Sequence, residues 1–240
     1  MLVSVVIPSY NRFDYLMNAI QSVLTQTYTL YEIIIVNDHS TDQRYYNCTI
    51  EKLDSRIKFI HLPKNTKSLF GFVCSNYVRD VGVANSKGKY IAFLDDDDIW
   101  FPTKLEKQID LIKITNTKLC CTDGYYGLGV FDPSKSYKLY NKESNYEGIK
   151  STHESKGSNL LKDGFPDIFN HRFLSYHNCV VTSSVLINKE LLVDHSCIQY
   201  MMNGMEDYVI WMTATNFSDM CYVKDPCFYY DGEHGDGRNY

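Results

Sequence analysis

The feature that most constrains the fold is an alternation of buried-strand and helical patterns over the first 120 residues. Segment 33–36 is continuously apolar and segment 3–7 is apolar apart from Ser4, as expected for strands covered on both faces. Segments 56–61 and 90–94 predict two further strands. Apolar residues recur at helical spacing after Phe13, and 72–85 predicts a second helix. This alternation predicts an α/β fold with a mainly parallel sheet and helices on both faces.

The second half of the chain is less regular. Residues 123–165 are rich in Tyr, Lys, Asn, Ser and Gly with weak periodicity, which predicts long loops or a mobile flap. Residues 182–188 predict a strand, and 205–217 predict a helix. We expect a single domain over 1–240, with halves 1–122 and 123–240. The loop-like residues 232–240 would also suit a domain that is part of a longer protein.

Charge and composition exclude some classes of function. The formal net charge of -5 argues against non-specific nucleic-acid binding, which needs a basic surface. No apolar run approaches the roughly 18 residues of a transmembrane helix, and no signal peptide is visible at the start. The eight cysteines form no C-x-x-C pair, which favours reduced, mostly buried thiols. We therefore expect a soluble protein of the cytoplasm or a host-cell interior.

Polar clusters follow three of the predicted strands, at 8–12, 37–42 and 95–98. Ligands of parallel α/β sheets bind outside the carboxyl ends of the strands. The three clusters should therefore meet in space and form a site.

Four consecutive carboxylates, Asp95 to Asp98, end the fourth strand. Two like charges about 4 Å apart repel by roughly 4 kcal/mol even at an effective dielectric of 20. Asp95 and Asp97 alternate along an extended backbone, so they can face the same way. Mg²⁺ or Mn²⁺, held by one or two carboxylates and a substrate diphosphate, would remove the repulsion. Asp98 is expected to cap the helix that follows, and a solvated acidic turn is the simpler alternative.

Four motifs in order resemble the family 2 glycosyltransferases, which have a GT-A fold and use nucleotide-sugar donors. They are VSVVIPSYNR (3–12), IVNDHSTD (35–42), GKYIAFLDDDD (88–98) and GMEDYVIW (204–211). The resemblance is clear over 3–122 and patchy beyond. It implies a Rossmann-like central sheet, a nucleotide-sugar-binding first half and an irregular acceptor-binding C-terminal half.

By this resemblance, seven residues bind the nucleotide-sugar: Pro8, Tyr10, Arg12, Asp38, Arg79, Asp95 and Asp96. Asp38 would accept a hydrogen bond from a uracil ring, which implies a UDP-sugar. The family pattern R-N-x-G stands here as Arg79-Asp80-Val81-Gly82, with Asp in place of Asn. Asp97 and Asp95 would be metal ligands for Mn²⁺ or Mg²⁺, with His234 completing the shell.

The acidic pair Glu206-Asp207 matches the family position beside the acceptor. Asp207 is favoured over Glu206 as the base that deprotonates the acceptor hydroxyl, with inversion at the anomeric carbon. The alternative is that both residues only complement a helix N-terminus. The resemblance implies a UDP-sugar donor, with glucose as the default ahead of galactose and N-acetylglucosamine. It also implies a carbohydrate or glycosylated acceptor, specified by residues 123–204.

Two rival functions remain open. A nucleotidyltransferase-like enzyme would normally carry a Gly-rich phosphate loop, whereas segment 8–12 contains no glycine. A catalytically degenerate module that binds UDP or sugar without turnover is the other rival. A dinucleotide-binding dehydrogenase is disfavoured because G-x-G-x-x-G is missing after the first strand.

Overall fold

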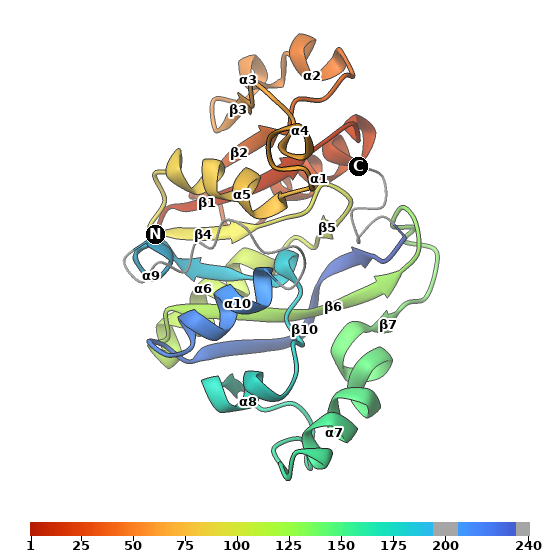
Figure 1. The fold of residues 1–240 in the computed structure, drawn as a ribbon, viewed down its shortest axis with the longest axis vertical. Helices are drawn as coiled ribbons and strands as arrows, with labels where there is room; N and C mark the ends of the chain where they lie inside the picture. The colour runs from red at the N-terminus through yellow and green to blue at the C-terminus, as the bar shows by residue number, and fades with distance from the viewer. Residues whose placement is uncertain (194–205, 234–240) are drawn as a thin grey trace.

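The computed structural model describes residues 1–193 and 206–233. These residues form one mixed sheet, in which both halves of the chain take part (Figure 1). Its strands are β1 (Val3–Ser9), β2 (Tyr31–Asn37), β3 (Ile57–His61), β4 (Tyr90–Phe93), β5 (Ile99–Trp100), β6 (Leu119–Gly127), β7 (Lys138–Leu139), β8 (Ile168–Phe169), β9 (Leu186–Asn188) and β10 (Met220–Asp231). Their order is β3-β2-β1-β4-β9-β6-β10-β5, with β7 added to β6 and β8 added to β10.

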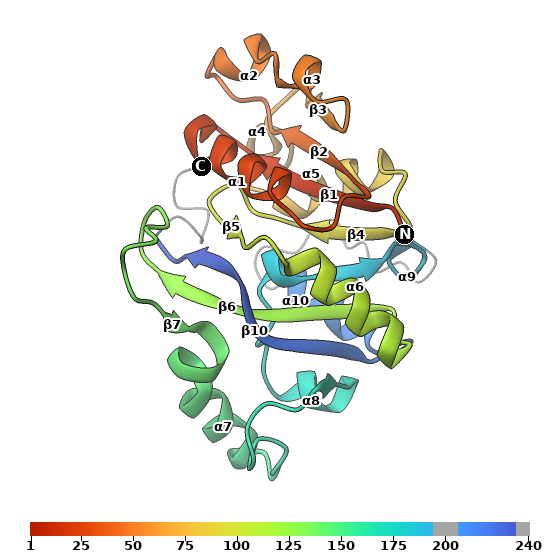
Figure 2. The ribbon, with the colours of Figure 1, turned by 180° about the vertical axis from the view of Figure 1, so that it is seen from behind.

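Helices cover both faces of this sheet. They are α1 (Phe13–Leu24), α2 (Arg44–Asn47), α3 (Ile50–Leu53), α4 (Thr66–Phe70), α5 (Ser75–Ala84), α6 (Lys104–Thr115), η1 (Tyr140–Asn145), α7 (Tyr146–Ser155), α8 (His171–Tyr176), η2 (Thr182–Ser184), α9 (Lys189–Val193) and α10 (Glu206–Ala214). Helices α1 and α6 lie on one face (Figure 2), and α5 and α10 lie on the other (Figure 1). Helices α7 and α8 lie beyond β10, and their residues Ile149 and Phe173 share an apolar cluster with Trp211 of α10. The α/β architecture expected from the sequence is confirmed.

The parallel core lies where the sequence predicts it. Strand β1 pairs in parallel with β2 and with β4, and β2 pairs in parallel with β3. All seven residues of β1 are buried, which explains its apolar sequence. Gly82 allows α5 to pack closely on β1, because a Cβ there would lie 2.4 Å from a methyl group of Val6. The carboxyl ends of β1, β2 and β4 therefore share one edge.

The prediction of long loops over 123–165 is wrong in part. Strand β6 continues to Gly127, and η1 and α7 form an ordered helical unit after it. The strand predicted over 182–188 is confirmed only for β9, because residues 182–184 form a 3₁₀ turn. Strand β10 was not predicted from the sequence; it pairs in parallel with β6 along most of its length. Strand β9 is antiparallel to both β4 and β6 and joins the two parallel parts.

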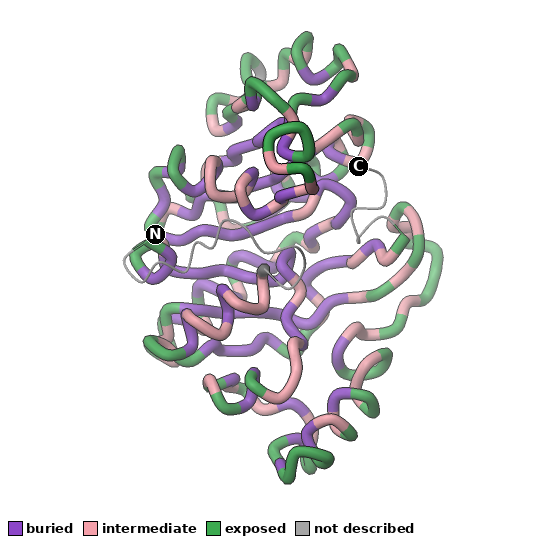
Figure 3. Tube along the Cα trace, in the orientation of Figure 1, coloured by how far each residue is buried: buried purple, intermediate pink, exposed green. Residues whose placement is uncertain are grey.

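Two main apolar clusters hold the layers together, one on each face of the sheet. The first contains Leu16 and Ile20 of α1 with Leu105 and Ile109 of α6, and the second contains Trp211 of α10. Burial is concentrated along the strands, as Figure 3 shows. Within 1–193 and 206–233, no helix is long and apolar enough to cross a membrane.

Candidate active site

The four carboxylates lie directly after β4, at the edge where β1 and β2 also end. A backbone hydrogen bond of 3.1 Å from Asp98 N to Asp95 O closes this turn. Asp96, Asp97 and Asp98 are buried, whereas the side chain of Asp95 is 28% exposed. Asp98 does not cap α6, because its Oδ1 accepts a 3.0 Å bond from Asp231 N of β10. Thr103 precedes α6 instead. Asp98 thus ties the turn to the last strand.

Two arginines supply the positive charge that this cluster requires. Arg12 Nη1 lies 3.2 Å from Asp96 Oδ1 and 2.7 Å from Asp97 Oδ2, and the side chain of Arg12 is only 11% exposed. Arg79 of α5 pairs with Asp95 through Nη2. Arg12 and Arg79, predicted as nucleotide contacts, therefore bind the carboxylate turn directly. Their proposed contacts with a nucleotide stay predictions.

The three buried carboxylates of this turn resist ionisation despite the arginines. Burial, reinforced by the neighbouring carboxylates, raises the pKa of Asp97 to about 8. Burial also raises the pKa of Asp96 to about 6, and that of Asp98 well above its ordinary value. Fully ionised, the four carboxylates would carry four negative charges against the two positive charges of the arginines, so a bound cation would favour ionisation of the turn.

This chemistry fits a hard divalent cation. Asp95 and Asp97 offer two carboxylates at the sheet edge, and Mg²⁺ or Mn²⁺ takes its other oxygen ligands from water and substrate phosphates. Within the described residues, no group of three His, Cys, Asp or Glu side chains is arranged as a metal cage. His234 lies outside the described residues. A metal held by Asp95 and Asp97 stays a prediction.

The nucleotide side of the site is built from the ends of β1 and β2. Pro8 is buried in β1, and Tyr10 is half-buried just after it. Asp38 is fully buried, and burial raises its pKa. Its carboxylate accepts bonds of 2.8 Å from Thr66 N, 2.6 Å from Thr66 Oγ1 and 3.1 Å from Asn65 Nδ2. The contact between Asp38 and uracil stays a prediction. It requires a carboxylate oxygen that already accepts one of these bonds to accept a second one from the uracil ring.

Two residues that the sequence analysis missed shape this side of the site. Ser9 Oγ donates a 2.6 Å hydrogen bond to Asp96 Oδ2 and lies 2.5 Å from Tyr45 Oη. Tyr45 Oη also accepts a 2.9 Å bond from Arg12 N, and burial raises the pKa of Tyr45 to about 12. Ser9 falls inside the first motif and could have been found there. Tyr45 sits on a four-residue helix and carries no signal in the sequence.

Asp207 reaches the same region from the C-terminal half. It is the second residue of α10, and its Oδ2 accepts a 3.2 Å bond from Thr182 Oγ1. Arg79, Thr182 and Asp207 line one small gap of about 10 Å³. Burial raises the pKa of Asp207, with Arg79 lowering it and Asp95 raising it further. Glu206 begins α10, but its side chain lies outside the described part. Asp207 and Asp95 therefore flank Arg79.

The described residues have the mixed α/β fold of the GT-A class. The computed structure matches the crystal structure of Staphylococcus aureus TarS in complex with UDP-GlcNAc with a TM-score of 0.72 and 16% sequence identity. The match covers 100% of this chain and 62% of that chain. At this level of identity the likeness concerns the fold.

Sequence comparison gives the family. The model of glycosyl transferase family 2 matches residues 4–175, and the chain belongs to this family. It is 37% identical over 213 residues to the Escherichia coli enzyme WfgD, named UDP-Glc:alpha-D-GlcNAc-diphosphoundecaprenol beta-1,3-glucosyltransferase, covering 88% of this chain and 69% of WfgD. It is 29% identical over 214 residues to an uncharacterised glycosyltransferase of Rickettsia felis, covering 89% of this chain and 30% of that protein. The chain thus spans less than a third of that longer relative.

Proposed function

We propose that this chain transfers a sugar from a UDP-sugar to a hydroxyl of a carbohydrate or glycosylated acceptor. The observation that supports it most is the convergence of Asp95 and Asp207 on Arg79, since one acid comes from each half of the chain. The family membership and the UDP-sugars named for WfgD and for the TarS complex favour the same donor class. UDP-glucose is the first donor to test.

In this proposal the residues of the site have separate roles in metal binding, phosphate binding and proton transfer. Asp95 and Asp97 would hold Mn²⁺ or Mg²⁺, which neutralises charge on the departing diphosphate. Arg12 and Arg79, which now pair with Asp97 and Asp95, would exchange a carboxylate partner for a phosphate oxygen. Asp207 would take the proton of the acceptor hydroxyl as that oxygen attacks the anomeric carbon, with inversion. Catalysis by such a base is typically worth about 10²- to 10⁴-fold.

The raised pKa of Asp207 fits the role of a base. Burial makes its carboxylate more basic than that of a solvated aspartate, and Arg79 nearby still favours the ionised form. The hydrogen bond from Thr182 fixes the orientation of the carboxylate. A base of this kind must face the anomeric carbon opposite the leaving diphosphate. A retained product configuration would therefore remove this role from Asp207.

The first experiment is a calorimetric titration of UDP into the protein with Mn²⁺ and then with EDTA. Metal-dependent binding is expected, followed by turnover in a screen of UDP-sugars against glycan acceptors. Asp97→Asn should abolish metal-dependent UDP binding, whereas Asp207→Asn should keep it and lose transfer. Asp219→Asn, at an exposed position, is the matched control and should change neither.

The two rivals predict different results in the same experiment. UDP binding without turnover of any UDP-sugar would support the degenerate module. Diphosphate release from a nucleoside triphosphate would support the nucleotidyltransferase-like enzyme. Metal-independent UDP binding with full activity would contradict the metal site at Asp95 and Asp97.

A further inference from the structure

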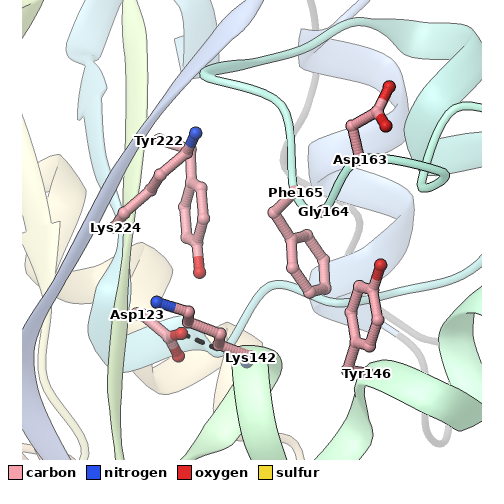
Figure 4. A pocket seen from close by; sticks show the side chains of 8 residues that line it. All are labelled: Asp123, Lys142, Tyr146, Asp163, Gly164, Phe165, Tyr222 and Lys224. Carbon is pink, nitrogen blue, oxygen red and sulfur yellow. Dashed lines mark hydrogen bonds between the residues drawn. The ribbon is translucent and has the colours of Figure 1, made fainter.

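A cavity of about 400 Å³ lies outside the acidic edge, between β6, β10, the start of α7 and the segment 163–165 (Figure 4). Three aromatic rings line it in a row. The ring centroids of Tyr146 and Phe165 are 5.9 Å apart, and those of Phe165 and Tyr222 are 5.8 Å apart. Tyr146 Oη donates a 2.8 Å bond to Leu161 O, which fixes its ring. The row offers a preformed apolar surface.

Charged side chains of both signs border these rings. Lys142, Asp163 and Lys224 also line the cavity, and all three are exposed. Lys224 pairs with Asp167 at 2.7 Å. Lys142 and Asp163 form no ion pair within the described part of the chain. An ammonium donates hydrogen bonds and a carboxylate accepts them, so the rim can satisfy a ligand that does both.

A buried carboxylate holds the rim in place. Asp123 of β6 is 1% exposed and accepts bonds of 2.9 Å from Gly124 N, 3.0 Å from Asn141 N and 3.3 Å from Lys142 N. These bonds fasten the beginning of η1 to the sheet, as the dashed line in Figure 4 indicates for Lys142. The backbone at Lys142 is thus held by the core of the protein, which places its side chain at the rim of the cavity.

Hydrogen bonds and a short stretch of chain link the segment beside the cavity to the residues around Asp207. Asn141 Nδ2 donates a 3.0 Å bond to Cys179 O, and Thr182, three residues on, bonds Asp207. Tyr140 lies within electrostatic range of both Asp123 and Asp207, which each raise its pKa in addition to the larger effect of burial. A ligand that extends from the cavity along this segment would lead toward Asp207.

We propose that this cavity binds a sugar unit of the acceptor, at a distance from the hydroxyl that receives the transferred sugar. The inference rests on the proposed function. A pyranose has an apolar face that suits the row of rings and hydroxyls that both donate and accept, as the rim requires. The balanced charge does not favour a polyanion. The volume falls within the range of about 300–1,000 Å³ found for small-molecule sites.

The first test is binding, and it does not need activity. The probes are the methyl glycosides of glucose, galactose and N-acetylglucosamine and their β-linked disaccharides, titrated into ¹⁵N-labelled full chain. The amide of Gly164, which lines the cavity, should shift with saturation near or below about 1 mM for at least one disaccharide. The amides of Gly71 and Gly157, outside the cavity, should not move. If no probe shifts Gly164, the proposal is wrong.

The second test is transfer, with the tightest-binding disaccharide as acceptor. Lys142→Ala and Asp163→Ala should each raise the acceptor KM about tenfold, the loss expected for a hydrogen bond to a charged group. The donor KM and the slow hydrolysis of the UDP-sugar should not change. Lys162→Ala is the matched control, since Lys162 is exposed beside the cavity and does not line it.

The outcomes separate the two proposals. Normal hydrolysis of the donor with an unchanged acceptor KM in both variants would overturn the cavity as an acceptor site and leave the transferase function intact. No hydrolysis and no transfer in the wild type would contradict the proposed function itself. Shifts at Gly164 would then identify a sugar-binding site without a transferase.

Discussion

Lys104 offers a quantitative test of the structure, because it is a fully buried cation in the main core. Its Nζ lies 3.9 Å from the ring centroid of Trp100 and donates a 2.7 Å bond to Gln108 Oε1. Burial lowers the pKa of Lys104 from its ordinary 10.5 to about 7. The unfolded chain therefore binds more protons than the folded protein between these values, so stability should rise with pH in this window.

The size of this effect follows from the two pKa values. Each pH unit of difference corresponds to about 1.36 kcal/mol, so the full rise between pH 7 and 10.5 is at most about 5 kcal/mol. The ring of Trp100 and the amide of Gln108 stabilise the ammonium, which makes this an upper limit. Replacing Lys104 with Met removes the titration and keeps the volume. We expect the free energy of unfolding of Lys104→Met to exceed that of the wild type by the largest amount at pH 6.5. That difference should shrink by up to about 3 kcal/mol at pH 9.5.

The assay is urea unfolding of both proteins at pH 6.5, 8 and 9.5, followed by circular dichroism. The difference between them reports Lys104 together with its electrostatic effect on the buried thiols of Cys120, Cys121 and Cys227, whose pKa values it lowers. Lys118→Met, at an exposed lysine, should follow the wild type at every pH. A stability difference for Lys104→Met that is independent of pH would refute the assigned burial of the ammonium.

Three further predictions test the site and the packing. Arg12→Met leaves Asp97 buried without its counter-charge and should cost about 3 kcal/mol of stability, with Mn²⁺ raising the Tm of the variant more than that of the wild type; an unchanged Tm would contradict the ion pair. Because burial raises the pKa of Asp207, the acid limb of kcat/KM should lie above the ordinary aspartate range, and activity should fall as pH drops through it; a profile that is flat down to about pH 4 would exclude this base. Gly88→Ala would place a Cβ 2.6 Å from Ser4 N and should lower the free energy of unfolding by about 1–3 kcal/mol. Gly148→Ala, whose Cβ would meet no atom within 4 Å, should raise it by about 0.5–1 kcal/mol, as measured by thermal unfolding.

The sequence predicted the first part of the fold well because its strands are buried on both faces. Such strands are largely apolar, and the apolar runs found in the sequence form most of β1, the middle of β2 and all of β4. Strand β10 was missed because Lys224-Asp225-Pro226 in its middle has the composition of a turn. The structure accommodates Pro226 at an irregularity where the register between β10 and β6 shifts.

The residues of the candidate site were predictable where motifs carried them, but their partners were not. The acidic turn and Asp207 stand out in the sequence. The pairing of Arg12 with Asp97 joins residues 85 positions apart, and no local pattern records it. No sequence pattern indicated the cavity bordered by Lys142. Only Ile149 and His153 of α7 are buried, so this helix has little apolar periodicity.

The position of β10 has a consequence for biosynthesis. It is the last described strand to be translated, yet it lies inside the sheet, between β6 and β5, and β8 also pairs with it. At roughly 5–20 residues per second, several seconds separate the emergence of β6 from that of β10. During that time β6 presents an unpaired apolar edge, which is a template for association with other chains. The yield of native protein should therefore depend on how well the nascent chain is shielded, by chaperones or by slow growth at low temperature, until residue 231 has left the ribosome.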